Sequence, residues 1–228
     1  MELLVSPSSV EEARNALAAD IIDVKKPSEG SLGANYPWVI REIKSITHKP
    51  VSAAIGDFSY LPGGAALAAL GAATAGADYI KIGLKFSGAA EAHDLINGVV
   101  RAVKEDFPEK YVVIAAYADY ARLNTISPEE MAPLAAQAGA DIAMIDTGIK
   151  DGKSLFDYYS EEDLQAFTDA NRALGLKTAL AGSLRFEDLE ALKRIDPDII
   201  GVRGMVCGGD RSAVVVKELV EEAMQLIR

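Results

Sequence analysis

Short apolar runs alternate with longer amphipathic runs along the whole chain, and each kind of run predicts one kind of element. The short runs predict eight strands, at residues 2–5, 20–24, 51–55, 78–83, 111–117, 141–146, 177–181 and 198–203. The longer runs carry apolar residues at helical spacing and predict helices at residues 10–19, 38–46, 65–74, 90–103, 128–138, 164–174, 186–195 and 214–227.

Strict alternation of strands and helices is typical of a parallel sheet covered by helices. Eight of each within 228 residues predict a compact α/β protein, a TIM (β/α)8 barrel, with residues 1–228 forming one domain. An open, doubly wound sheet is the alternative fold. No GxGxxG motif follows the first strand, which disfavours a dinucleotide-binding version of that sheet.

Four of the predicted strands repeat one pattern: a small residue or proline, then an aspartate, then the strand. The repeats span residues 19–25, 77–83, 140–146 and 197–203. The second and fourth residues after each aspartate are apolar and suit the face under the helices. The third and fifth residues lie on the opposite face, which points into a barrel, and their charged members are Asp23, Lys25, Lys81, Asp146 and Arg203.

Alternate strands of a TIM barrel contribute to common interior layers, so we expect these five charges to meet at the carboxyl end of the barrel. Unpaired charges are costly in a core, which favours a functional cluster over packing. The aspartates that open the repeats have a simpler interpretation, because each only needs to cap the start of its strand. They are Asp20, Asp78, Asp141 and Asp198.

Glycine-rich turns follow the last two predicted strands, where TIM barrels often bind phosphate. Backbone N–H groups near a helix start, together with an arginine, form a phosphate cradle. The alternative is that these turns only close loops. The predicted phosphate-binding residues are Gly182, Ser183, Arg203, Gly204, Gly208, Gly209 and Arg211.

Lys25 is the candidate for amine catalysis. An amine must lose its proton before it can attack a carbonyl, and a free lysine has a pKa near 10.4. A like charge about 5 Å away, from Lys81 or Lys153, would lower the pKa of Lys25 by roughly 2 units. Asp23 and Asp146 would then relay protons or hold the ammonium groups apart. The alternative is a plain ion pair, with Lys25 or Lys26 bound to Asp23 or Glu29.

Composition narrows the possible partners. The net charge of −11 disfavours nucleic acid and anionic membranes, and no apolar run is long enough for a transmembrane helix. The first residues have neither the basic nor the apolar part of a signal peptide, so a cytoplasmic location is expected. The single cysteine, Cys207, is expected to be an apolar filler, and Asp57 and Asp119 are rim residues without an assigned role.

Several long blocks of the sequence resemble one known family. They are Ile21-Ile22-Asp23-Val24-Lys25, residues 29–38, residues 51–57, Gly76-Ala77-Asp78-Tyr79-Ile80-Lys81, residues 151–157 and Ala179-Leu180-Ala181-Gly182-Ser183. Together they resemble the (5-formylfuran-3-yl)methyl phosphate synthases, which serve methanofuran biosynthesis and related cofactor pathways. Lys26 departs from the family pattern, because a neutral residue such as asparagine is expected there.

The resemblance implies a TIM-barrel lyase that joins two molecules of glyceraldehyde 3-phosphate, with loss of phosphate and water. Matched by motif, the Schiff-base lysine falls on Lys25 and the proton-accepting lysine on Lys81. Asp23, Asp146 and Lys153 match other charged positions of the pocket. No metal or other cofactor is expected, because the iminium itself withdraws electrons. Barrels of this size often assemble, so a homo-oligomer is expected.

Two other functions remain open from the sequence. A class I aldolase or a sugar-phosphate isomerase on the same barrel would use the same lysines and give a linear product. A non-catalytic sensor of phosphorylated ligands would be stabilised by them without turnover. The two inward lysines argue against the sensor, since a sensor needs cations but not two closely placed amines.

Overall fold

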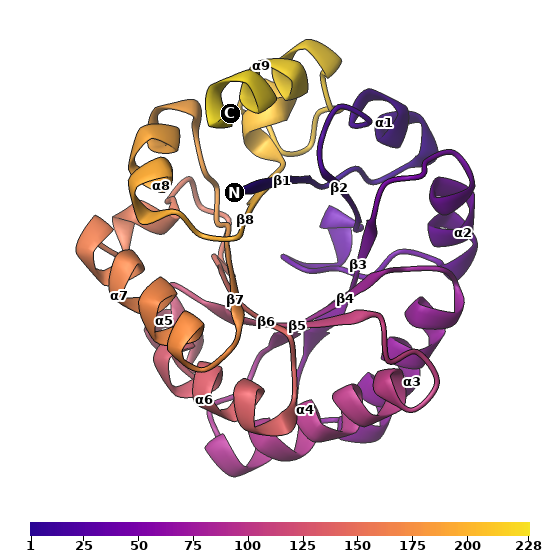
Figure 1. Cartoon of the computed structure of the whole chain (residues 1–228), viewed down its shortest axis with the longest axis vertical. Coiled ribbons are helices and arrows are strands. Elements are labelled where there is room, and N and C mark those ends of the chain that lie inside the picture. The colour runs from indigo at the N-terminus through magenta and orange to yellow at the C-terminus, as the bar shows by residue number, and fades with distance from the viewer.

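The computed structural model describes all residues, 1–228, and shows eight parallel strands closed into a barrel inside a ring of helices (Figure 1). The strands pair in sequence order and β8 pairs with β1. The strands are β1 (Glu2–Val5), β2 (Ile21–Val24), β3 (Val51–Phe58), β4 (Tyr79–Leu84), β5 (Tyr111–Tyr117), β6 (Ile142–Asp146), β7 (Lys177–Leu180) and β8 (Ile199–Val202). The helices are α1 (Val10–Asn15), α2 (Pro37–Ser45), α3 (Pro62–Thr74), α4 (Ala89–Lys104), α5 (Tyr120–Leu123), α6 (Pro128–Ala138), α7 (Glu161–Ala173), α8 (Leu189–Ile195) and α9 (Lys217–Ile227).

The TIM barrel predicted from the alternation of runs is therefore confirmed, although most element boundaries differ from the predicted ones by one or more residues and the short helix α5 was not predicted. The first helix ends at Asn15, four residues before its predicted end. The helix predicted from residue 186 begins with a 3₁₀ turn at Phe186–Asp188 and becomes α-helical at Leu189. Strand β3 runs on to Phe58 because its pairing with β4 shifts by one residue between Ala54 and Gly56.

Two apolar layers confirm which residues of the repeats face outward. The second and fourth positions, such as Ile22, Val24 and Ile80, belong to a cluster of 56 buried residues between barrel and helices. A separate cluster of 12 buried residues fills the barrel interior, and it includes Met144. Leu32, from the loop between β2 and α2, also enters this inner cluster.

The aspartates that open the repeats cap the strand starts, as predicted. Each accepts a hydrogen bond from a backbone N–H of the preceding strand in the barrel. The bonds run from Leu3 N to Asp20 Oδ2 (3.0 Å), Val51 N to Asp78 Oδ2 (2.7 Å), Val112 N to Asp141 Oδ2 (2.7 Å) and Thr178 N to Asp198 Oδ2 (2.8 Å). The repeat therefore ties each even-numbered strand to the odd-numbered strand before it.

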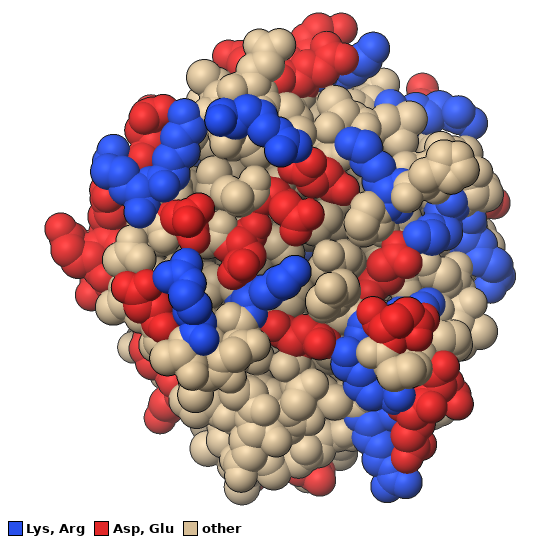
Figure 2. All heavy atoms as spheres, in the orientation of Figure 1, with Lys and Arg blue, Asp and Glu red and all other residues tan.

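Charge is mixed over the face of the molecule drawn in Figure 2. Acidic and basic side chains are interspersed there, so the excess negative charge does not form one acidic patch on that face. No helix has the length and apolar character needed to cross a membrane.

Candidate active site

The inward charges of the repeats meet at the carboxyl end of the barrel. Lys81 Nζ lies 2.8 Å from Asp23 Oδ2, and the two side chains are only 2% and 0% exposed. Asp23 also accepts hydrogen bonds from the hydroxyls of Ser6 and Ser52, both at 2.7 Å. Burial alone would raise the pKa of Asp23, but the charges of Lys81 and Lys25 outweigh it and lower that pKa. Asp23 is therefore a fully bonded carboxylate that fixes the Lys81 amine.

Lys25 is buried in the same cluster, yet its amine forms no ion pair and no hydrogen bond with another side chain. Burial lowers the pKa of Lys25 to about 8, and the positive charges of Lys81 and Lys150 act in the same direction. The negative charges of Asp146 and Asp23 oppose the shift. The sequence predicted that a neighbouring positive charge would be the main cause of the lowered pKa of Lys25. In the structure, burial is the larger cause.

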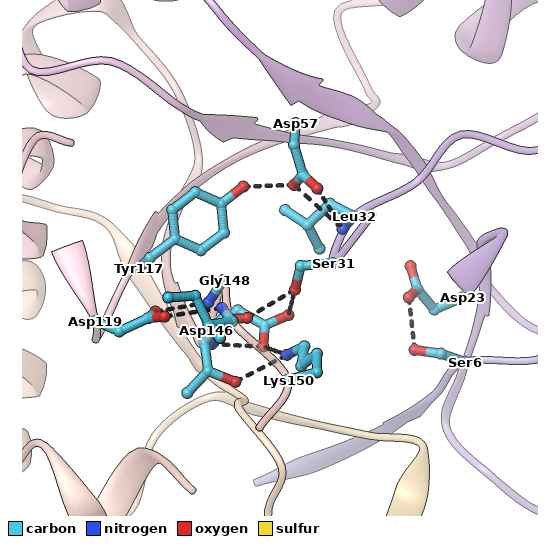
Figure 3. Close-up of polar contacts among 12 residues, drawn as sticks. Ser6, Asp23, Ser31, Leu32, Asp57, Tyr117, Asp119, Asp146, Gly148 and Lys150 are labelled. Atoms are coloured by element: carbon cyan, nitrogen blue, oxygen red, sulfur yellow. Dashed lines mark hydrogen bonds and ion pairs between the residues drawn. The ribbon is translucent and has the colours of Figure 1, made fainter. Parts of the chain in front are cut away.

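A second carboxylate–amine pair stands beside the first. Lys150 Nζ lies 2.8 Å from Asp146 Oδ1 and donates to Thr147 Oγ1 at 2.8 Å (Figure 3). Burial would raise the pKa of Asp146, but the charges of Lys150 and Lys25 lower it. Sequence reasoning missed Lys150 and named Lys153 in its place. Lys153 is exposed, its amine lies over the Tyr158 ring, and the structure does not bring it into the cluster.

These groups open into one cavity of about 590 Å³, a volume within the range of small-molecule sites. Lys25, Lys81, Asp146 and Lys150 line it together with the turns after β7 and β8. All seven residues predicted to bind phosphate are part of its wall. No group of three or more histidine, cysteine, aspartate or glutamate side chains is arranged to hold a metal ion.

The two arginines of the predicted phosphate site differ in their bonding. The N–H groups of Arg203 are directed at carbonyl and carboxylate oxygens of the protein: Arg211 O, Ser6 O, Ala213 O and both carboxylate oxygens of Glu12. All five of its donors are thus engaged, which leaves none free for a phosphate.

Arg211 has a free donor where Arg203 has none. Its Nη2 atom is buried and has no hydrogen-bond partner. Burial lowers the pKa of Arg211 because the charged guanidinium loses its hydration. A bound anion would replace that lost hydration with a hydrogen bond and an opposite charge. In the turn after β7, Gly182 and Ser183 both have positive φ values, 114° and 52°. A non-glycine residue in this region is a local strain that often marks a functional site.

Asp57 and Asp119 hold the loops around the cluster (Figure 3). Asp57 accepts hydrogen bonds from Leu32 N at 3.2 Å and from the buried hydroxyl of Tyr117. The register shift in β3, at Gly56, brings Asp57 opposite Gly83, an inward position of the repeat. Asp119 accepts from Gly148 N and Ile149 N, at 2.7 and 2.8 Å, and so fixes the loop that carries Lys150.

Cys207 is buried beside this region, as expected for an apolar filler. Burial raises the pKa of its thiol, which disfavours the reactive thiolate.

The chain is similar to known proteins over nearly its whole length. The family described as 4-HFC-P synthase matches residues 3–224. The chain is 57% identical over 227 residues to (5-formylfuran-3-yl)methyl phosphate synthase of Methanosarcina mazei, with 97% of each chain covered. It is 52% identical over 235 residues to the synthase of Methanocaldococcus jannaschii, with 100% of both covered.

Solved structures share the fold at low identity. A 3-hexulose-6-phosphate synthase from Salmonella typhimurium matches with a TM-score of 0.69 at 20% identity, covering 100% of this chain and 98% of that one. Orotidine 5'-monophosphate decarboxylase from Methanocaldococcus jannaschii matches with a TM-score of 0.70 at 16% identity, with the same coverage. These likenesses show the TIM-barrel fold alone. The near-complete matches in sequence show more, and the chain belongs to the (5-formylfuran-3-yl)methyl phosphate synthase family.

Proposed function

We propose that this protein joins two molecules of glyceraldehyde 3-phosphate into (5-formylfuran-3-yl)methyl phosphate, through a Schiff base on Lys25. Membership of the synthase family supports the product. The balanced reaction releases one phosphate and two molecules of water and involves no net oxidation or reduction. It therefore needs groups that form an iminium, move protons and hold phosphate.

The observation that carries the proposal is the Lys25 amine, which faces the cavity without a carboxylate partner. With a pKa of about 8, roughly one amine in ten is neutral at pH 7 and half are neutral at pH 8. A neutral amine attacks the aldehyde carbon of one triose phosphate and expels its oxygen as water. The resulting iminium draws electrons from the neighbouring carbon and makes its proton acidic.

The two carboxylate–amine pairs supply the proton transfers. Lys81 lines the cavity, and Asp23 holds its amine in place. Once its ammonium has passed a proton to Asp23, the neutral Lys81 amine is our candidate for the proton acceptor that converts iminium into enamine. Lys150 and Asp146 lie on the same wall. They are our candidates for protonating the oxygen that leaves as water when the furan ring closes.

The retained phosphate is assigned to Arg211 and the surrounding turns. Arg211 offers a buried N–H group without a partner, and Gly182, Ser183, Gly204 and Gly208 line the same cavity. Arg211 and Lys25 line the same cavity, which supports one triose phosphate bound with its phosphate at Arg211 and its carbonyl at Lys25. Beta-elimination of the other phosphate and aldol addition to the second triose complete the carbon skeleton.

Trapping tests both the product and the amine. The protein is incubated with glyceraldehyde 3-phosphate, ultraviolet absorbance of a furan is followed, and borohydride is added before peptide mass spectrometry. We expect furan absorbance and a reduced adduct on Lys25. An active Lys25→Ala variant with no trapped adduct anywhere would refute the mechanism. A linear product would favour an aldolase or isomerase, and stabilisation by ligand without turnover would favour a sensor.

A further inference from the structure

We propose that Glu12 and Arg203 form a positioning pair that fixes the phosphate-binding segment of the cavity. This inference rests on the proposed function of that segment. Glu12 lies on α1 and Arg203 follows β8, so the pair joins the first and last βα units of the barrel. Arg203 Nη1 lies 2.8 Å from Glu12 Oε2, and the two side chains are only 6% and 8% exposed. Such burial is costly unless every donor is used.

What Arg203 holds is the backbone of the segment that carries Arg211. Its Nε donates to the carbonyl of Arg211 at 2.7 Å, and its Nη2 donates to the carbonyl of Ala213 at 3.2 Å. Helix α1 adds a third attachment, because Asn15 Nδ2 donates to the carbonyl of Val215 at 2.9 Å. The backbone is therefore fixed by Arg203 and Asn15, while the Arg211 side chain, with its unpartnered Nη2, lines the cavity.

The same pair is connected to the lysine cluster through one residue of β1's carboxyl end. The carbonyl of Ser6 accepts from Arg203 Nη1 at 2.6 Å, while its hydroxyl donates to Asp23 Oδ2 at 2.7 Å. Asp23 in turn holds Lys81. A continuous series of hydrogen bonds thus connects the phosphate segment to the Lys81 amine. The positioning pair touches no reacting atom, so its loss should weaken phosphate binding and leave the amine chemistry intact.

Glu12→Gln and Arg203→Lys test this role, with Glu161→Gln as the matched control. Glu161 accepts two hydrogen bonds from Arg194 and so pairs α7 with α8, but that pair is exposed and neither residue lines the cavity. The dissociation constant of inorganic phosphate is measured by calorimetry, and KM and kcat are measured with glyceraldehyde 3-phosphate. We expect the dissociation constant and KM to rise about tenfold or more in both test variants, the factor that one charge-assisted hydrogen bond supplies. We expect kcat at saturation to stay within about threefold.

A double-variant comparison separates positioning from general loss of structure. If Glu12 acts through Arg211, then Glu12→Gln made on top of Arg211→Gln should weaken phosphate binding by less than about twofold. Full additivity of the two effects would overturn the proposal. So would a folded Arg203→Lys variant with wild-type phosphate affinity, and this variant decides the matter if Glu12→Gln does not fold.

The proposed function can fail independently of this inference. If the wild-type protein binds phosphate in a Glu12-dependent way but forms no furan, the positioning pair is supported and the proposed reaction is refuted. If furan forms and Glu12→Gln leaves phosphate affinity and KM unchanged, the reaction is supported and the positioning pair is refuted.

Discussion

The two ends of the barrel use the same residue types in opposite ways. At the amino ends of the even strands, aspartates accept backbone N–H groups, and two of them also pair with lysines at partly exposed positions. The Lys44–Asp78 side chains are each 36% exposed, and the Lys104–Asp141 side chains are each 25% exposed. At the carboxyl ends, Lys81 and Asp23 are almost completely buried.

The difference lies in what surrounds each charge. An exposed lysine beside an aspartate is solvated by water, which keeps it protonated and weakens the pair. A lysine inside the barrel mouth has lost that water, and its protonation depends on how many carboxylates face it. Lys81 has a carboxylate in direct contact and Lys25 has none, and burial lowers the pKa of Lys25 to about 8.

Removing one lysine from each end gives the largest expected contrast. Lys25→Met should lower the rate of furan formation by at least about a thousandfold, because the proposed iminium forms on Lys25 and the other two lysine amines of the cavity wall are paired with carboxylates. Lys44→Met, at the other end, should change the rate by less than about twofold. Steady-state assays of both purified variants measure this. A comparable loss in both variants would show that the position of the amine does not matter.

Breaking the carboxylate side of each pair should affect stability unequally. Asp23→Asn leaves the Lys81 ammonium buried without a counter-charge, which should cost about 3–5 kcal/mol. Asp78→Asn breaks a pair of half-exposed side chains and should cost about 1 kcal/mol or less. Urea unfolding of both variants measures the free energies. Equal losses would contradict the difference in burial between the two pairs.

The pH dependence of trapping tests the state of Lys25. Its pKa in the folded protein is lowered to about 8, so the neutral amine is present above pH 8 and is lost as the pH falls. With limiting substrate, the rate of borohydride-trapped adduct formation should rise about tenfold per pH unit below 8 and level off above it.

Variants of the neighbouring charges sharpen the pH test. Asp146 raises the pKa of Lys25 and Lys81 lowers it. The midpoint of the profile should therefore move to lower pH in Asp146→Asn and to higher pH in Lys81→Met. A midpoint that stays near 10 in the wild-type protein would contradict the burial of Lys25.

The barrel fold and the inward direction of the charged side chains were predictable because both depend on regular repeats in the sequence. Alternation along a strand fixes which side chains point inward, and this placed Asp23, Lys25, Lys81 and Asp146 correctly. The same argument could not place Asp57, because the register shift at Gly56 reverses the alternation partway along β3. In the sequence, the only trace of this bulge is the glycine at position 56.

Loop residues and distant partners were not predictable. Lys150 and Lys153 lie three residues apart in one loop, and a loop has no regular alternation that predicts which side chain points into the cavity. In the structure it is Lys150 that pairs with Asp146, whereas Lys153 lies over the Tyr158 ring. Arg203 was placed in the cavity wall, but its bonds could not be foreseen. Its partner Glu12 lies 191 residues away in the sequence and looks like an ordinary first-turn acid of a helix.

The smallest expected effect comes from an aspartate that has no lysine partner. The side chain of Asp198 accepts only the backbone N–H of Thr178, at 2.8 Å. Asp198→Ala therefore removes one hydrogen bond from the amino end of the barrel. The loss should be about 1 kcal/mol, which lowers the melting temperature by about 2–4 °C for a chain of this size. Furan formation should stay within about twofold, because the cavity wall is built at the other end of β8. Calorimetric melting and steady-state assays measure the two effects, and a large loss of activity with little change in melting would place the aspartates of both ends in one functional unit.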